Sequence, residues 1–204
     1  MLNLNNIETG APVGAPLELI PERTVVRAVI NLLGGETELT EFGQGGLFVK
    51  SQTSSAIYCP LEFTIIGGDF NTRRVWHNLF VHGDKLDDNG VSVARNIGLS
   101  TLRRMIDSIH GLLSSDMSPE AQAKRNISGL MDLQSKEFCF SVGIEPEKNG
   151  YAAKNKMSLV LTPDNPEYVS GGGQPASAPP ASSTVVPPAA VQNGGGVAPS
   201  WAQR

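Results

Sequence analysis

An alternating run of charged and aromatic residues carries the clearest chemical signal in the sequence. Arg74, Trp76 and Phe80 are spaced by even numbers of positions, so a β-strand would place all three side chains on one face. Aromatic rings stack on unpaired nucleobases, each stacked base being worth roughly 1–3 kcal/mol, and a guanidinium can stack or neutralise a phosphate. If that face is exposed, the spacing predicts a surface that binds single-stranded nucleic acid.

The same run also allows the opposite orientation. In one arrangement Val75, Leu79 and Val81 point into the core and the aromatic face lies outside. In the other arrangement Trp76 and Phe80 are buried under a helix and the aliphatic residues are half-exposed. The alternation is identical in both cases, so the sequence leaves both open.

Further cations could follow a nucleic-acid backbone along this surface. We expect them from the first two strands, from beside the aromatic face and from the last hairpin: Arg27, Lys50, Arg73, Lys148, Lys154 and Lys156. Lysines near a turn are also common as solvated surface residues, so each has that second interpretation. Arg103-Arg104 and Lys124-Arg125 are expected to lie on solvated helix faces.

Signals for catalysis, metals and cofactors are weak. His77, His82 and His110, together with Cys59 and Cys139, lack metal-ligand spacing. The sequence contains no GxSxG, HExxH or phosphate-binding GxxxxGK(S/T) motif. We therefore expect a protein that is not an enzyme and has no catalytic residues, cofactor or metal. Both cysteines fall in strand-like runs, where they act as small hydrophobes, and a reduced cytoplasmic setting is the simplest interpretation.

Five runs with a period of two must position these residues. They span residues 23–33, 57–66, 73–82, 136–145 and 154–162, with a shorter apolar run at 47–49. Glycine-rich turns at 67–69 and 149–150 predict hairpins between neighbouring runs. In the last two strands we expect these residues to point inward: Phe138, Phe140, Val142, Ile144, Met157, Leu159 and Leu161.

Between the third and fourth strands the apolar period becomes that of a helix. Apolar residues recur at helical spacing over residues 93–113. Because Gly98 weakens the first part, the continuous helix is expected to begin near Leu99, with Ser100 as a candidate N-cap. A second helix is expected to begin after a cap at Ser118 and to end near residue 130.

This order of elements predicts the architecture. Five strands with a helix between the third and fourth are typical of an OB-type barrel, so we expect a mainly β fold with helices (α+β). The chain then divides into an N-terminal loop segment 1–22, an OB-like nucleic-acid-binding domain 23–168 and a tail 169–204. From Ser170, Gly, Pro, Ser and Ala make up 24 of 35 residues, a composition typical of disorder. Trp201 and Arg204 at its tip could dock on a partner, or could be incidental.

Charge and hydropathy limit the classes of function. The formal net charge is −4, which counts against a strongly basic binder but allows a local basic groove. No apolar run reaches the roughly 18 residues of a membrane span. The first residues lack the basic and apolar regions of a secretory signal, so we expect a cytoplasmic protein.

Several motifs resemble a phage and prophage family, a domain of unknown function linked to single-stranded-DNA binding and recombination. The matching stretches are residues 61–70, 73–79, 96–102 and 154–156, and a tail tip with a Pro-x-Trp-like ending is also similar. The resemblance implies an OB-like fold and a role beside phage replication or recombination enzymes. Bacterial-type single-strand binders usually end in acidic residues that recruit partners. Here no acid follows Glu167, so a different docking mode is expected.

Together, these patterns predict a non-enzymatic protein that binds single-stranded DNA in replication or recombination. We expect the tail to recruit replication or recombination proteins. The alternative is an interaction or assembly module whose sheet packs against another protein. Self-association and the choice between DNA and RNA stay open.

Overall fold

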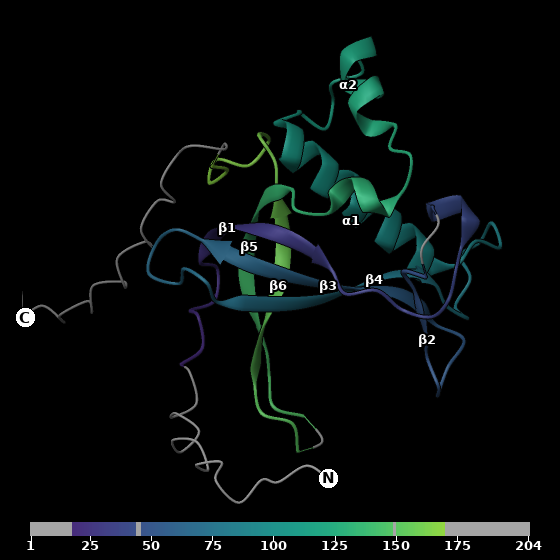
Figure 1. The fold of residues 1–204 in the computed structure, drawn as a ribbon, viewed down its shortest axis with the longest axis horizontal. Coiled ribbons are helices and arrows are strands. Elements are labelled where there is room, and N and C mark those ends of the chain that lie inside the picture. Colours follow the sequence, from purple (N-terminus) through teal and green to yellow (C-terminus); the bar gives the residue numbers. More distant parts are fainter. Residues whose placement is uncertain (1–17, 44–45, 149, 170–204) are drawn as a thin grey trace, which may run out of the picture.

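The structure is a computed structural model that describes residues 18–43, 46–148 and 150–169. The described chain is mainly β, with six strands and two α-helices (Figure 1). The strands are β1 (Val25–Leu32), β2 (Val49–Lys50), β3 (Ile57–Ile66), β4 (Arg74–His82), β5 (Glu137–Glu145) and β6 (Lys154–Leu161). The helices are α1 (Val93–His110) and α2 (Pro119–Arg125), with 3-10 turns η1 (Thr40–Phe42) and η2 (Leu130–Leu133).

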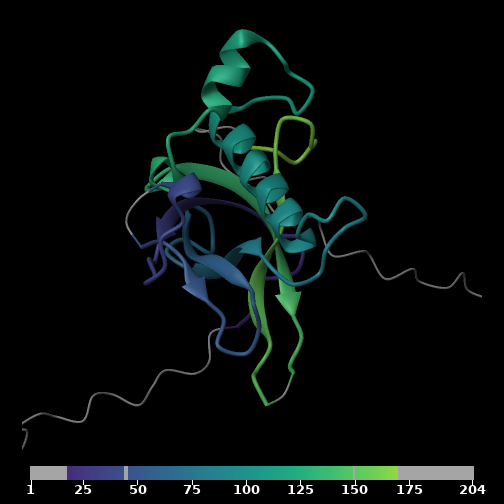
Figure 2. The same cartoon turned by 90° about the vertical axis from the view of Figure 1, so that its right-hand side faces the viewer.

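All strand pairs are antiparallel and belong to one sheet. β1 lies between β3 and β5, β4 pairs with the other edge of β3, and β6 pairs with β5. Helix α1 lies across one end of this curved sheet, and the β5–β6 hairpin projects from the opposite end (Figures 1 and 2). Among the described strands no ladder joins β4 to β6, so the sheet is open at that seam. The structure does not establish the predicted closed barrel.

The strand count differs from the prediction of five. The additional strand, β2, has only two residues and pairs with the first two residues of β3, beyond the end of β1. A strand of two residues is too short to show an alternation of apolar and polar residues, so β2 could not be predicted from the sequence. The other five strands lie within the predicted runs, and the β3–β4 and β5–β6 hairpins are confirmed.

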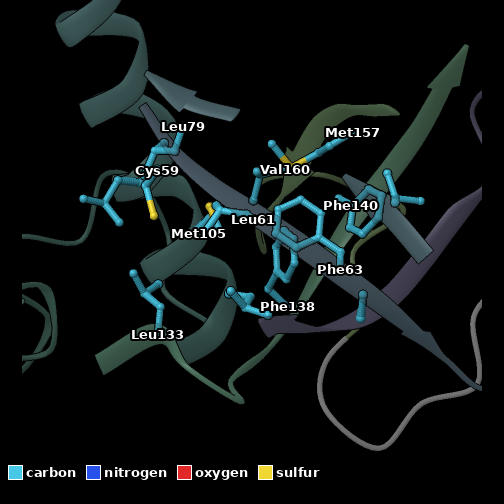
Figure 3. Close-up of a cluster of buried hydrophobic side chains, with 14 of the residues drawn as sticks. Cys59, Leu61, Phe63, Leu79, Met105, Leu133, Phe138, Phe140, Met157 and Val160 are labelled. Carbon is cyan, nitrogen blue, oxygen red and sulfur yellow. The ribbon is translucent and has the colours of Figure 1, made fainter. Parts of the chain in front are cut away.

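The core fills the concave side of the sheet. Phe63, Phe138 and Phe140 contact one another with ring centroids 4.8–5.5 Å apart (Figure 3). Met105 of α1 and Met157 of β6 complete the same cluster from other elements. Burying a side chain of this size contributes about 1.5–3 kcal/mol, so this cluster holds the helix and both hairpins on one centre.

The inward residues of the last strand differ from the predicted set. The ladder between β5 and β6 shifts its register between Ser141 and Val142. A bulge of this kind exchanges inside and outside along one strand. Val160 is therefore buried, whereas Leu159, predicted to point inward, is 41% exposed. Ile144 is only half-buried, and the other predicted inward residues of both strands are buried.

Helix α1 begins six residues earlier than predicted, at Val93 rather than Leu99. Its N-cap is Ser92, whose hydroxyl accepts a hydrogen bond from the backbone N–H of Arg95, and Ser100 is an interior residue. Gly98, interpreted from the sequence as a weak point, is where the helix backbone meets β4. A Cβ at this position would lie 1.7 Å from the carbonyl oxygen of Phe80, so only glycine fits.

Helix α2 starts at the predicted cap, where the Ser118 hydroxyl accepts from the N–H of Ala121. It ends at Arg125, earlier than predicted, and η2 follows as a separate turn. No helix among the described residues is long and apolar enough to cross a membrane. Most of the predicted N-terminal loop and the tail from Ser170, including Trp201 and Arg204, lie outside the described residues.

Candidate nucleic-acid interface

The outer face of β4 presents the predicted aromatic residues. Val75 and Leu79 are buried in the core, with exposed fractions of 0% and 1%. Trp76 and Phe80 point the other way, with exposed fractions of 56% and 39%. Of the two orientations that the sequence left open, the structure has the one with the rings outside. The ring of Tyr58 on β3 packs beside Phe80, with centroids 5.5 Å apart.

A groove of about 310 Å³ runs along this face, between β4, the first half of α1 and β6. We call it the β4–β6 groove. Six of its lining residues offer rings, apolar surface, a hydroxyl or positive charge to a ligand: Trp76, Phe80, Ile97, Thr101, Lys154 and Lys156. The seam at which the sheet stays open is thus also the place where the predicted aromatic residues meet Lys154 and Lys156, two of the predicted cations.

Three local features position the walls of this groove. β4 is held along its length by its ladder with β3, in which Glu62 lies opposite Trp76. Gly98 allows α1 to rest directly on the backbone of β4. On the other side, Lys154 and Lys156 alternate on β6 opposite Glu145 and Gly143 of β5, so both point to the same side of the hairpin.

The positive charges of the groove are partly matched by carboxylates. The Nζ of Lys154 lies 3.2 Å from Glu145, and Arg74, next along β4, lies 3.4 Å from Glu62. The Lys154–Glu145 pair is exposed on both sides, and such a pair contributes only about 0–1 kcal/mol, so a phosphate can replace this carboxylate at small cost. Lys156 makes no ion pair with any other described residue, which leaves its charge available to a ligand.

His77 also borders the groove, on the inner side of β4. Its ring stacks on Phe63 at a centroid distance of 6.2 Å, and burial lowers its pKa to about 4. The imidazole is therefore neutral at neutral pH and adds no charge to the groove.

The other predicted cations lie elsewhere. Arg73 donates a hydrogen bond of 2.8 Å to the carbonyl oxygen of Glu18, and Lys50 is exposed on β2. Lys148 is exposed near the tip of the β5–β6 hairpin. Arg27 is half-buried on β1 and ion-paired with Glu137, so its charge is already engaged far along the sheet from the aromatic face.

The arginines of helices α1 and α2 that were predicted to be solvated instead form hydrogen bonds or ion pairs within the protein. Arg104 donates to the carbonyl oxygen of Val160 at 3.1 Å, and Arg103 pairs with Asp107 at 3.0 Å. The side chain of Arg125 is only 8% exposed, because it pairs with the buried carboxylate of Asp107 at 2.6 Å. Arginine heads can stay charged below the surface when a carboxylate or several carbonyls accept from them.

Two residues with large exposed side chains, Ile97 and Tyr151, were not predicted to be exposed from the sequence. Ile97 was assigned to the apolar face of the helix, but it is 63% exposed at the groove, because α1 turns Gly98 rather than Ile97 toward β4. Tyr151 is 80% exposed beside the hairpin tip. In the sequence it directly follows Asn149-Gly150, a dipeptide typical of hairpin turns, and this signal could have marked it as a tip residue.

The described residues contain no group of three or more His, Cys, Asp or Glu side chains arranged to hold a metal ion. Cys59 and Cys139 are both buried free thiols, as expected for small hydrophobes. Burial raises the pKa of the Cys59 thiol to about 12 and also raises that of Cys139. Neither is a reactive thiolate at neutral pH.

No protein-family model matches the chain, and no curated protein has a sequence similar to it. The interpretation of the β4–β6 groove therefore depends on its own geometry and charge.

Proposed function

We propose that this chain is a non-enzymatic single-stranded-DNA-binding protein that acts in phage DNA replication or recombination in the host cytoplasm. The observation that carries the proposal is the exposure of Trp76 and Phe80 along a groove whose opposite wall supplies Lys154 and Lys156. Proteins that bind single-stranded nucleic acid commonly combine aromatic rings that stack on bases with positive groups that neutralise phosphates.

A closed OB-like barrel is part of this proposal. β4 and β6 lie side by side at the open seam, and residues of both strands line the groove. With β2 left aside, the chain order of strands around α1 is the OB order, in which the binding face lies on the second and third strands and nearby loops. A strand of nucleic acid in the groove would then lie across the seam.

The shape of the groove favours a single strand over a duplex. Trp76 and Phe80 line the groove from β4, and residues of α1 and β6 line it from the other two elements. Stacking on these rings requires an unpaired base, whose faces are free. In a duplex the base faces are already stacked on one another, so only weaker phosphate contacts would remain.

The charge of the groove predicts how binding responds to salt. The protein as a whole is acidic, with a net charge of −4, so non-specific attraction to DNA is weak. Binding instead replaces local ion pairs such as Lys154–Glu145 with contacts to phosphate. Because those contacts release counterions, affinity should fall steeply as salt is added.

Tryptophan fluorescence tests the proposal directly. The chain has two tryptophans, so a Trp201→Phe background leaves Trp76 as the reporter. Poly(dT) should quench it in a saturable way, and Trp76→Ala, followed by gel shift, should weaken binding about 5- to 150-fold. Leu86→Ala is the matched control, because Leu86 is 57% exposed but does not line the groove. Unchanged fluorescence, or equal small losses in both variants, would end the proposal.

The same surface supports a second candidate, a protein–protein assembly module. Ile97 is exposed beside Trp76 and Phe80, and Glu145 lies among the groove lysines, which is a mixture typical of a protein interface. In that case poly(dT) would leave the fluorescence unchanged. The Ile97→Asp variant would then lower the oligomeric mass measured by light scattering, whereas Leu86→Asp would leave it unaltered.

A further inference from the structure

A second concave site lies at the other end of α1, outside the β4–β6 groove. It is a cleft of about 520 Å³ between the last turns of α1, the end of α2, η2 and the start of β5. We call it the α1–α2 cleft. Its size falls within the range of roughly 300–1,000 Å³ that is usual for ligand sites in proteins. None of its lining residues belongs to the groove.

We propose that the α1–α2 cleft is a docking site for an acidic segment of a partner protein, one that carries an apolar side chain between carboxylates. The proposal does not depend on the proposed DNA-binding function, because it uses different residues.

The floor of the cleft is aliphatic. Ile106 and Leu133 are buried beneath it, and Ile109 and Ile127 pack partly buried against the same core. At the rim Met131 is 53% exposed, and its flexible thioether side chain can adapt to the shape of a bound residue. An apolar side chain entering here would exchange water for aliphatic contact on several sides.

The rim of the cleft is basic. Lys124 and Lys136 are exposed and make no ion pair with any other described residue. Both act on His110 between them: its pKa is lowered by burial first and then by the positive charges of the two lysines. Both lysines line the same cleft, so a carboxylate bound there would be attracted by both ammonium groups.

The single acid on the rim, Asp132, offsets only part of this charge: the positive charge of Lys136 contributes to its lowered pKa, but Lys124 lies on the same rim. The carboxylate of Asp132 accepts from the backbone N–H of Ser128 at 2.7 Å and from its hydroxyl at 2.9 Å. These hydrogen bonds hold Asp132 against its own turn and keep its pKa low. With two lysines and one carboxylate on the rim, a net positive charge remains for an incoming group.

The composition of the cleft distinguishes a peptide from a nucleic acid. Its lining contains no Phe, Tyr or Trp side chain, so it lacks the stacking surface that the β4–β6 groove has. An aliphatic floor with lysines at the rim matches the alternation of apolar and acidic side chains in a peptide. The two sites are also separated along α1. The helix residues that line the groove and those that line the cleft are about nine residues apart, which corresponds to about 14 Å of helix.

The cleft is preformed in the folded chain. Arg125, next to Lys124, is fixed by the Asp107 carboxylate and by the carbonyl oxygens of Asp116 and Leu113, the latter at 2.8 Å. The wall that carries Lys124 therefore has a fixed position relative to α1. A preorganised site loses less free energy on binding than a flexible one.

NMR titration of the isotope-labelled full chain tests the proposal. The probe is a short synthetic peptide with aspartates on both sides of a Leu-Phe pair, and the control peptide has asparagines instead. Saturable shifts should concentrate on amides of the α1–α2 cleft for the aspartate peptide only. Lys124→Glu and Lys136→Glu should each weaken binding about fivefold or more, whereas Lys85→Glu, an exposed lysine elsewhere, should not.

Three outcomes would overturn the proposal. The first is equal binding of both peptides, and the second is shifts scattered over the surface. The third is a loss of poly(dT) affinity in Lys124→Glu and Lys136→Glu as large as in Trp76→Ala, which would assign the cleft to nucleic acid. Failure of the DNA-binding proposal would be visible separately, because Trp76→Ala should leave the peptide titration unchanged.

Discussion

The two ends of helix α1 are fixed to the rest of the protein in different ways. Near its N-terminal end, Gly98 brings the helix backbone into contact with the backbone of β4. Near its C-terminal end, Asp107 is buried between Arg103 and Arg125 and ties the helix to α2. The first contact depends on the absence of a side chain and the second on a pair of charges.

This difference explains what each end can bind. Close backbone packing at Gly98 leaves neighbouring side chains such as Ile97 free to line the β4–β6 groove. The ionic contact at the other end uses Arg103 and Arg125 internally, so the cations that line the α1–α2 cleft are Lys124 and Lys136. Both sites contain lysines, but the groove adds the aromatic rings of β4 and the cleft adds an aliphatic floor.

The largest expected effect on stability comes from removing the buried carboxylate of Asp107, which ties α1 to α2. Asp107→Ala removes a carboxylate that is 2% exposed and leaves the guanidinium of Arg125 buried without a counter-charge. Losing one partner of a buried pair typically costs about 3–5 kcal/mol, and urea denaturation should show a loss of that size. Asp69→Ala, at an exposed turn position, is the control and should leave stability nearly unchanged. Equal stability of the two variants would mean that the two arginines find other acceptors.

Breaking the glycine contact should have the next largest effect. In Gly98→Ala the new methyl group would sit 1.7 Å from the Phe80 carbonyl oxygen, so α1 must move away from β4. Such overpacking costs typically about 1–3 kcal/mol, although alanine itself favours the helix. The displacement should also weaken poly(dT) binding, which fluorescence titration would measure. Ser100→Ala, on the exposed side of α1, should change neither quantity.

The strands could be predicted well from the sequence, whereas the start of α1 was predicted wrongly, because the two predictions depend on different kinds of information. Alternation reports which face of a strand is buried, and β3 matches its predicted bounds. Helix propensity treats Gly98 as a break, whereas its function is to fit against a backbone that the sequence does not reveal. The bulge at Ser141 and Val142 likewise depends on pairing and moved Leu159 outward.

The candidate site was foreseen in part. Trp76 and Phe80 could be named from spacing, but their exposure had to come from the structure, since either face of β4 could be buried. Arg27 and Arg74 both carry a guanidinium group, and both lie on strands whose apolar residues alternate. Both are ion-paired, but the side chain of Arg27 is 16% exposed beside Glu137, whereas that of Arg74 is 61% exposed beside Glu62, and only the structure shows this difference.

A smaller effect should distinguish two histidines, His77 on β4 and His110 at the C-terminal end of α1. Burial lowers the pKa of His77 to about 4, below the ordinary 6.5, so the unfolded chain binds a proton that the folded chain excludes. The stabilisation that His77 gives is complete above about pH 6.5 and is lost as pH falls toward about 4, with about 2 kcal/mol gone between about pH 7 and pH 5.

Urea denaturation of variants at the two pH values tests this assignment. His77→Phe should remove that part of the pH dependence, because phenylalanine cannot be protonated. His110→Gln, at the more exposed end, should retain most of it, since the pKa of His110 is lowered in the same direction but in a less buried setting. A wild-type loss that persists in His77→Phe would assign the proton uptake to other groups.

The burial of both native cysteines has a practical consequence. Because Cys59 and Cys139 are buried in the sheet as protonated thiols, maleimide reagents should not react with the folded chain. A cysteine introduced at Asn78, in the middle of the β4–β6 groove, could then be labelled alone. The dye attached there would report on any molecule that enters, whichever chemistry the molecule has.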